Sequence, residues 1–220
     1  MRATAPATPL DYSFMGLSAL SEMLQHDPVG GKKKGSGGPS SPTSNASSLE
    51  GPDAEKTTTV KPRARALAPV SLRVNNNKIA ALDDMDDALA AVFDDPCKLQ
   101  WLDLSGNNLT TIPKNAFAKY ADLLTLHLHG NQLSRYVDID HLAACLPRLH
   151  SLTLHGNPIE EKKQYRSYVI ASFPQLKQLN FSSVTKGDRD KAETWARIHL
   201  KAIQAARHKG QRGASDGDYD

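Results

Sequence analysis

The sequence predicts an α/β solenoid of about four to five short coils, with parallel strands on a concave face and helices on a convex face. One pattern, LxxLxLxxNxL, occurs in full three times in the chain of 220 residues. Its copies are LQWLDLSGNNL, LLTLHLHGNQL and LHSLTLHGNPI, which begin at residues 99, 123 and 149. The intervals of 24 and 26 residues are typical of an architecture that stacks one supersecondary unit on the next.

Weaker copies precede and follow these three, at residues 69–79 and 176–184. The final copy, LKQLNFSSV, has Phe181 as an inward residue and Val184 where asparagine is expected. Within each LxL, the two leucines lie on the buried face of a strand and the residue between them faces outward. The asparagine follows at the bend, where its amide can bond the backbone of adjacent coils. This pattern is a leucine-rich repeat.

The convex side and the C-terminal end follow from the same pattern. Helical periodicity predicts helices over residues 81–93, 137–146 and 161–173. Because each coil buries its apolar face only against its neighbours, both ends of the stack need a cap. Thr185 and Asp188 form a Thr-x-x-Asp start for a final helix, and we expect Trp195 on that helix to cover the last coil.

The two ends of the chain differ in composition from the repeats. Residues 26–66 include 17 Gly, Pro or Ser among 41 and no aromatic residue, which predicts a disordered linker. Leu17, Leu20 and Leu24 stand at helical spacing, which predicts a short amphipathic helix. The predicted organisation is an N-terminal segment 1–25, the linker 26–66, the repeats 67–184, a cap helix 185–207 and a disordered tail 208–220.

Charge and composition exclude several classes of function. Residues 67–200 carry 15 Lys and Arg against 15 Asp and Glu, so the net charge of +3 lies in the tails. A neutral solenoid offers no broad footprint for a phosphate backbone, and no direct nucleic-acid binding is expected. No apolar run reaches the roughly 20 residues that cross a bilayer, and no signal peptide is recognised. With Cys97 and Cys145 taken as unpaired thiols, the sequence favours a cytoplasmic protein.

Four dipeptides surround the last strand: Tyr165-Arg166, Phe173-Pro174, Val184-Thr185 and Asp188-Arg189. They resemble the cap of the SDS22-like class of leucine-rich repeats, found in U2A-prime, the nuclear export factor TAP and dynein light chain 1. The segments PLDYSF, VNNNKI and VTKGDRDKAETW extend the likeness to the family of leucine-rich repeat-containing protein 51. This resemblance implies a cytoplasmic repeat protein without catalysis. The analogy with dynein light chain 1 implies a ciliary or axonemal role.

The outward strand positions hold the candidate site residues. Strands lie about 4.8 Å apart, so we expect His129 and His155 to be lateral neighbours on one face. The predicted partner-binding face comprises Trp101, Asp103, His127, His129, Thr153 and His155, with Arg73 at its rim. Histidines and a carboxylate can also ligate zinc, but a gently curved sheet spreads its side chains apart. We therefore favour a binding surface, with no metal and no cofactor.

Two features leave alternatives open. Trp101 is of a type enriched at binding hot spots, but Tyr12 and Phe14 of the N-terminal segment are available to cover it. The acidic run at residues 83–87 is either a solvated helix face or a docking site.

The sequence predicts a non-enzymatic scaffold whose concave face binds a protein partner, because no nucleophile elbow, phosphate loop or zinc-protease motif occurs. By analogy the partner is axonemal or microtubule-associated, and no membrane or small-molecule partner is expected. The alternatives are a ribonucleoprotein adaptor, as U2A-prime is, and a phosphatase regulator of the SDS22 type.

Overall fold

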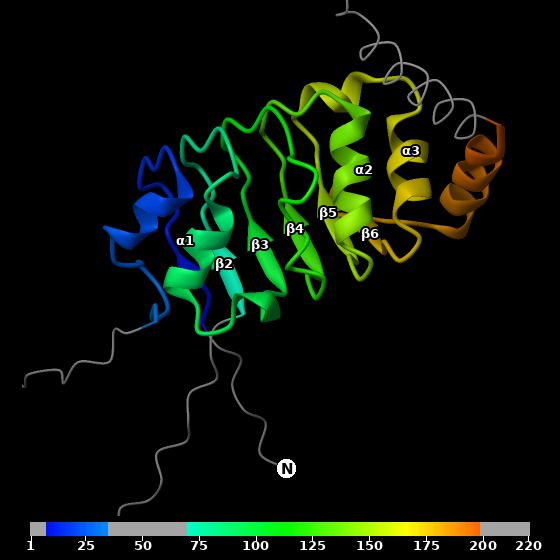
Figure 1. The fold of residues 1–220 in the computed structure, drawn as a ribbon. Coiled ribbons are helices and arrows are strands. Elements are labelled where there is room, and N and C mark those ends of the chain that lie inside the picture. Colours follow the sequence, from blue (N-terminus) through cyan, green and yellow to red (C-terminus); the bar gives the residue numbers. More distant parts are fainter. Residues whose placement is uncertain (1–7, 35–69, 199–220) are drawn as a thin grey trace, which may run out of the picture.

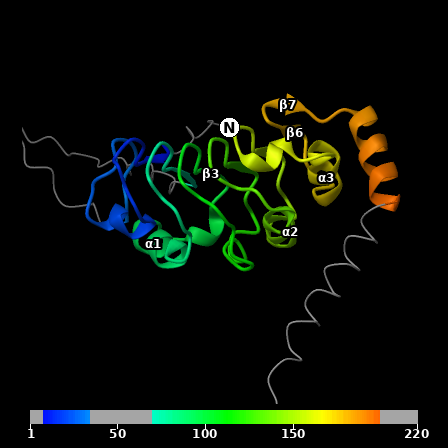
Figure 2. The same ribbon diagram turned by 90° about the horizontal axis from the view of Figure 1, so that it is seen from above.

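A single sheet of seven short strands organises the molecule. The computed structural model describes residues 8–34 and 70–198, and Figure 1 shows how their strands follow one another along the solenoid. The strands stand in chain order from β1 to β7, and all neighbours are parallel except the final pair. Seen from above in Figure 2, α1 (Met85–Val92) and α2 (Tyr136–Cys145) lie on the opposite side from β6 (Gln178–Leu179) and β7 (Ser182–Ser183). The predicted fold class is confirmed.

The repeat strands pair residue for residue. They are β2 (Ser71–Arg73), β3 (Trp101–Asp103), β4 (Thr125–His127) and β5 (Ser151–Thr153). Their central leucines are aligned and buried, as the LxL alternation predicts. This alignment places the outward residues of successive strands side by side on the other face.

Helices return the chain as predicted, although the first and third are shorter than expected and the second begins one residue earlier. They are α1 (Met85–Val92), α2 (Tyr136–Cys145) and α3 (Tyr165–Ser172), with short 3₁₀ turns η2 (Pro96–Lys98) and η3 (Pro158–Glu161). The coil between β3 and β4 returns through turns instead of a helix. Each helix in the described ranges is too short or too polar to span a bilayer.

Buried asparagines join neighbouring coils, as the pattern predicts. The Nδ2 of Asn131 donates to the carbonyls of Leu104 (3.0 Å) and Leu128 (2.9 Å), and its Oδ1 accepts the N–H of Leu109 at 3.0 Å. Equivalent bonds are made by Asn77, Asn107 and Asn157. The ladder therefore satisfies backbone groups that the leucine core would otherwise leave unpaired.

The residue before each ladder asparagine has a left-handed backbone. Its φ is 54° at Asn76, 63° at Gly106, 66° at Gly130 and 68° at Gly156. Glycine adopts this conformation without strain and asparagine tolerates it, whereas other residues rarely do. This requirement explains the Gly-Asn pair of the repeat.

The N-terminal segment forms an additional coil that the repeat pattern did not indicate. β1 (Leu10–Asp11) pairs in parallel with β2, and η1 (Leu20–Leu24) packs against α1. The segment buries Leu10, Tyr12, Leu17, Leu20 and Met23. Leu24, expected on the inward side of a helix, is instead exposed. The segment is therefore the N-terminal cap of the solenoid.

The structure differs from the predicted linker over residues 26–34. The Val29 N–H donates to the Asp11 carbonyl at 2.8 Å, and the Asp11 N–H donates to Gly30 at 3.0 Å, which covers the outer edge of β1. A further bond joins the Lys34 N–H to the Val92 carbonyl at 2.9 Å. These backbone bonds hold the chain as far as residue 34. The rest of the predicted linker and the predicted tail lie outside the described residues.

At the C-terminal end, the described part of the predicted cap helix covers residues 186–198. Its start is the predicted Thr-x-x-Asp pair, because the Asp188 N–H donates to Thr185 Oγ1 at 3.1 Å and the Thr185 N–H donates to Asp188 at 3.0 Å. Trp195 packs against the core, as expected.

The inward position predicted for Phe181 is wrong. β6 (Gln178–Leu179) and β7 (Ser182–Ser183) form a hairpin whose two turn residues, Asn180 and Phe181, have φ values of 52° and 62°. Such a turn reverses the chain just before the inward position, which leaves the Phe181 side chain exposed.

Candidate protein-binding face

The predicted site residues lie together on the face of the sheet opposite the helices. Strand register aligns Arg73, Asp103, His127 and Thr153 in one row across β2 to β5. Trp101 precedes this row on β3, and His129 and His155 follow β4 and β5. One surface therefore contains all seven residues.

His127 lies at the centre of this surface. Its ring centroid is 5.4 Å from that of Trp101 and 6.0 Å from that of His129. His129 stacks on His155, with centroids 4.6 Å apart, as the predicted lateral neighbours. The Thr153 hydroxyl bonds Nδ1 of both His127 (3.2 Å) and His129 (2.8 Å). These contacts hold the imidazole rings in fixed positions.

Phe181 completes the cluster, although the sequence pattern placed it elsewhere. Its ring centroid lies 5.5 Å from His127, 5.8 Å from His129 and 5.7 Å from His155. The available signal was Asn180, because asparagine favours the first position of a two-residue hairpin. We call Trp101, His127, His129, His155 and Phe181 the aromatic cluster.

Two predicted residues support the surface from below. Asp103 is 9% exposed, and its Oδ1 accepts both the Ser105 N–H (3.0 Å) and the Ser105 hydroxyl (2.6 Å). Thr153 is fully buried beneath the imidazoles. Their side chains shape the bend and orient the rings, so the aromatic cluster is what the face presents.

The surroundings of Trp101 show whether the N-terminal segment covers its ring. The Arg73 guanidinium lies 5.5 Å from the Trp101 ring centre and 3.3 Å from Asp11. Tyr12 is buried in the N-terminal coil, and Phe14 is exposed. In the described chain, the tryptophan is therefore flanked by a paired arginine and is not buried by the N-terminal segment.

The imidazoles favour their uncharged form. Burial is the main cause that lowers the pKa of His127 and of His129. Asp103 opposes it and His155 adds to it; the effect of Asp103 exceeds that of His155 at His127, and the reverse holds at His129. Among the described residues, no group of three or more His, Cys, Asp or Glu is arranged to hold a metal ion. The cluster can offer apolar ring surface and neutral hydrogen-bonding nitrogens.

This burial makes stability depend on pH. The unfolded chain, whose histidines titrate near 6.5, binds protons more readily than folded His127 and His129 do. Their contribution is therefore complete above the unfolded pKa and is lost as the pH falls toward the folded pKa. We expect the urea midpoint of unfolding to be lower at about pH 5.5 than at about pH 7.5. The difference between the two pH values should be smaller in a His127→Gln, His129→Gln variant.

The exposed His26 provides the control for that titration. A His26→Gln variant should keep the full pH dependence of the unmodified protein. The same drop in midpoint in all three proteins would contradict a role for the cluster.

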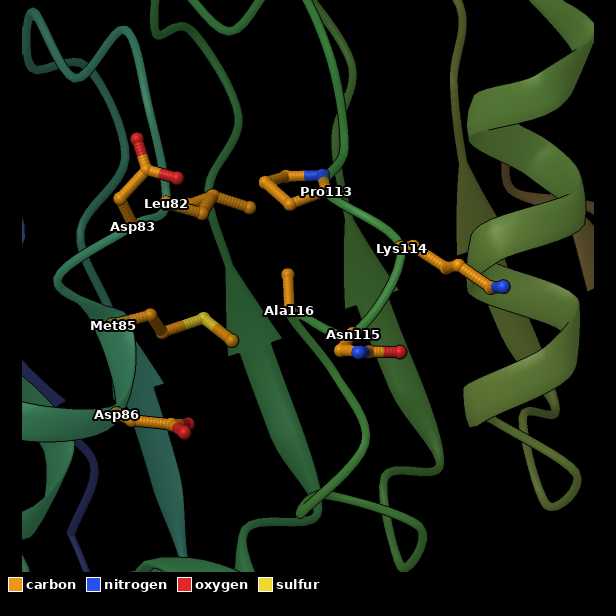
Figure 3. Close-up of a pocket in the computed structure, with 8 residues that line it drawn as sticks. All are labelled: Leu82, Asp83, Met85, Asp86, Pro113, Lys114, Asn115 and Ala116. Atoms are coloured by element: carbon orange, nitrogen blue, oxygen red, sulfur yellow. The ribbon is translucent and has the colours of Figure 1, made fainter. Parts of the chain in front are cut away.

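A separate pocket lies on the helical side, between α1 and residues 113–116 (Figure 3). Leu82 and Pro113 face each other across it, and none of the predicted site residues lines it. Asp86, from the acidic run, accepts the Tyr120 hydroxyl at 2.7 Å and pairs with Lys119. This carboxylate joins α1 to the next coil and is not a free docking group.

The strands, ladder and concave face define the class of protein, a leucine-rich-repeat interaction protein. The leucine-rich repeat family model matches residues 77–208. Over 201 residues, the chain is 38% identical to leucine-rich repeat-containing protein 51 of Bos taurus, covering 91% of each protein. The chain belongs to the family of leucine-rich repeat-containing protein 51, as its motifs predicted.

The chain also has more distant relatives. The chain is 36% identical over 96 residues to U2 small nuclear ribonucleoprotein A' of Schizosaccharomyces pombe, which covers 44% of this chain and 40% of that protein. Among solved structures, the Drosophila melanogaster SNF/U2A' complex matches with a TM-score of 0.52 and 25% identity. That match covers 62% of this chain and 74% of the other.

Proposed function

We propose that this protein is a non-enzymatic scaffold whose concave face binds a protein partner. The observation that carries the proposal is the aromatic cluster, in which rings from β3, β4, β5 and the β6–β7 turn gather on one open surface. Aromatic residues dominate the energetics of protein interfaces. A face whose rings are already held in place also lowers the entropy cost of binding.

The proposal includes a cytoplasmic location and a partner of the axonemal or microtubule-associated kind. Its support is the resemblance of the C-terminal cap to the class that includes dynein light chain 1. Proximity labelling in ciliated cells would test the location, and labelling confined to nuclear proteins would contradict it.

A Trp101→Ala, His127→Ala variant tests the binding face. We expect it to stay folded by circular dichroism and to lose at least about tenfold in affinity for partners captured by the unmodified protein, as hot-spot truncations do. The matched control is Leu24→Ala, His26→Ala, which removes an exposed apolar residue and an exposed histidine outside the aromatic cluster. A folded variant that keeps its partners would refute the proposal.

A second candidate is an adaptor within a ribonucleoprotein. The similarity to U2 small nuclear ribonucleoprotein A', and to U2A' in complex with SNF, favours it. Because residues 67–200 carry no net charge, we expect a protein to mediate any contact with RNA. Copurifying RNA that disappears on nuclease treatment, while a protein partner remains, would support this candidate over the first.

A further inference from the structure

We propose that Phe14 and Phe181 are the two anchors of the binding face, and that together they hold an uncharged, apolar face of a partner helix. The proposal rests on the proposed function, because it names the partner chemistry of the same face. Both side chains are exposed, at 76% and 62%, and both residues have left-handed φ values of 59° and 62°. A phenylalanine in that conformation is strained, and such strain concentrates at functional sites.

Phe14 occupies a position that the other coils give to small or flexible residues. Strand register aligns it with Asn76 and Gly106, which immediately precede ladder asparagines. Its N–H donates to the Asn75 carbonyl, just as the Gly106 N–H donates to His129. Glycine or asparagine would make the same turn without strain. Folding therefore gives no reason for a phenylalanine whose ring remains in solvent.

Phe181 presents the same problem at the other end. In a two-residue hairpin with both φ values positive, asparagine followed by glycine is strongly preferred. Asn180 meets the first preference, but Phe181 violates the second. Its ring touches three imidazoles and still leaves most of its surface exposed. A partner that covers the ring would compensate for both the strain and the exposure.

The two phenylalanines lie at opposite ends of the same face of the sheet. Phe14 lines a pocket with Val29, Arg73 and Asp103, and the Arg73 guanidinium lies over the Trp101 ring. Phe181 reaches back over the histidines of β4 and β5. Three to four strand spacings of about 4.8 Å separate the β1 end from this ring, which is on the order of 15 Å. Three turns of α-helix, about 16 Å, span that distance.

The edges of the sheet favour a helix over an extended peptide as the partner. At one edge, Gly30 bridges Asp11 of β1, and at the other β7 covers β6. An added strand therefore finds a bridged edge at β1 and only the two-residue edge of β7 at the other end of the described sheet. A partner that lies across the face must satisfy its own backbone hydrogen bonds, which a helix does.

The charges of the face select the side chains of that helix. Arg73 is paired with Asp11, and Asp103 is enclosed by its bonds to Ser105. Burial favours the neutral form of the central imidazoles. A helix with apolar side chains about three turns apart, and uncharged residues between them, fits this surface better than an acidic or basic one.

The test compares stability and binding in Phe14→Asn and Phe181→Gly variants of the full chain. The probe is a peptide selected on the unmodified protein from a helix-favouring display library of about 20 residues, long enough for three turns. We expect the urea midpoint of each variant to stay equal or to rise, because strain is relieved. The affinity for the selected peptide should fall at least about tenfold in each. The control is Leu24→Asn, which replaces an exposed apolar residue on η1. It should leave the affinity for the selected peptide unchanged.

Opposite outcomes separate this proposal from the proposed function. Peptide affinity kept in both phenylalanine variants but lost in Trp101→Ala would overturn the anchors and leave the binding face intact. Affinity kept in all three would overturn the face itself. A fall in the urea midpoint would show that the rings stabilise the fold, and a strongly charged consensus among selected peptides would exclude the apolar helix.

Discussion

Replacing Asn131 with alanine should lower the free energy of unfolding by about 3 to 5 kcal/mol, because it removes three buried hydrogen bonds and leaves one buried N–H without a partner. The side chain is 1% exposed and bonds the backbone of two coils at once. Its removal leaves the Leu109 N–H without its partner. The carbonyls of Leu104 and Leu128 each lose one of two amide donors, because Asn107 and Asn157 still donate to them. Urea denaturation followed by circular dichroism measures the loss.

Asn108 is a matched control for this substitution. It follows the ladder residue Asn107 directly, and it is exposed. Asn108→Ala should therefore change the free energy of unfolding by less than about 0.5 kcal/mol, as surface substitutions do. Comparable losses in the two variants would mean that the ladder contributes little beyond ordinary loop structure.

Truncating Tyr12 to alanine should destabilise the protein by about 3 to 5 kcal/mol, the range for removing a large ring from a core. Tyr12 is fully buried in the N-terminal coil, next to the strand pairing of β1 with β2. The cavity would loosen the cap, and the apolar side chains of β2 and α1 beneath it would meet water. A lower urea midpoint and increased binding of an apolar dye are the expected results.

Tyr12→Phe distinguishes the ring from its hydroxyl. The Tyr12 hydroxyl is buried and has no hydrogen-bond partner among the residues that the structure describes. Removing a buried, unpaired polar group should leave stability unchanged or raise it by up to about 1 kcal/mol. If Tyr12→Phe were as damaging as Tyr12→Ala, the N-terminal coil would depend on a polar contact and not on packing.

The strand residues that point into the core were predictable, because the local sequence pattern determines them. An alternation with period two assigns each residue of a short strand to a face, and Leu102, Leu126 and Leu152 follow it without exception. Equal pattern positions in successive coils also predict lateral neighbours. His129 and His155 stack for that reason.

The two ends of the solenoid were not predictable in the same way. β1 is two residues long and lies 59 residues before β2 in the chain, so its pairing is visible only in three dimensions. At the other end, the local pattern continues through Phe181 as an inward residue. Within the described residues, β7 and the cap helix follow in place of a further coil, and the chain reverses at Asn180.

By itself, the sequence determined the family, the register of the repeat strands and which residues face outward, because these depend on spacing along the chain. Only the tertiary structure decided that Phe14 and Phe181 belong to the concave face. Their positions depend on how the end coils close the sheet, and that closure is set by contacts between segments distant in sequence. The repeat strands therefore supply the central residues of the face, and the two end coils supply the two anchors.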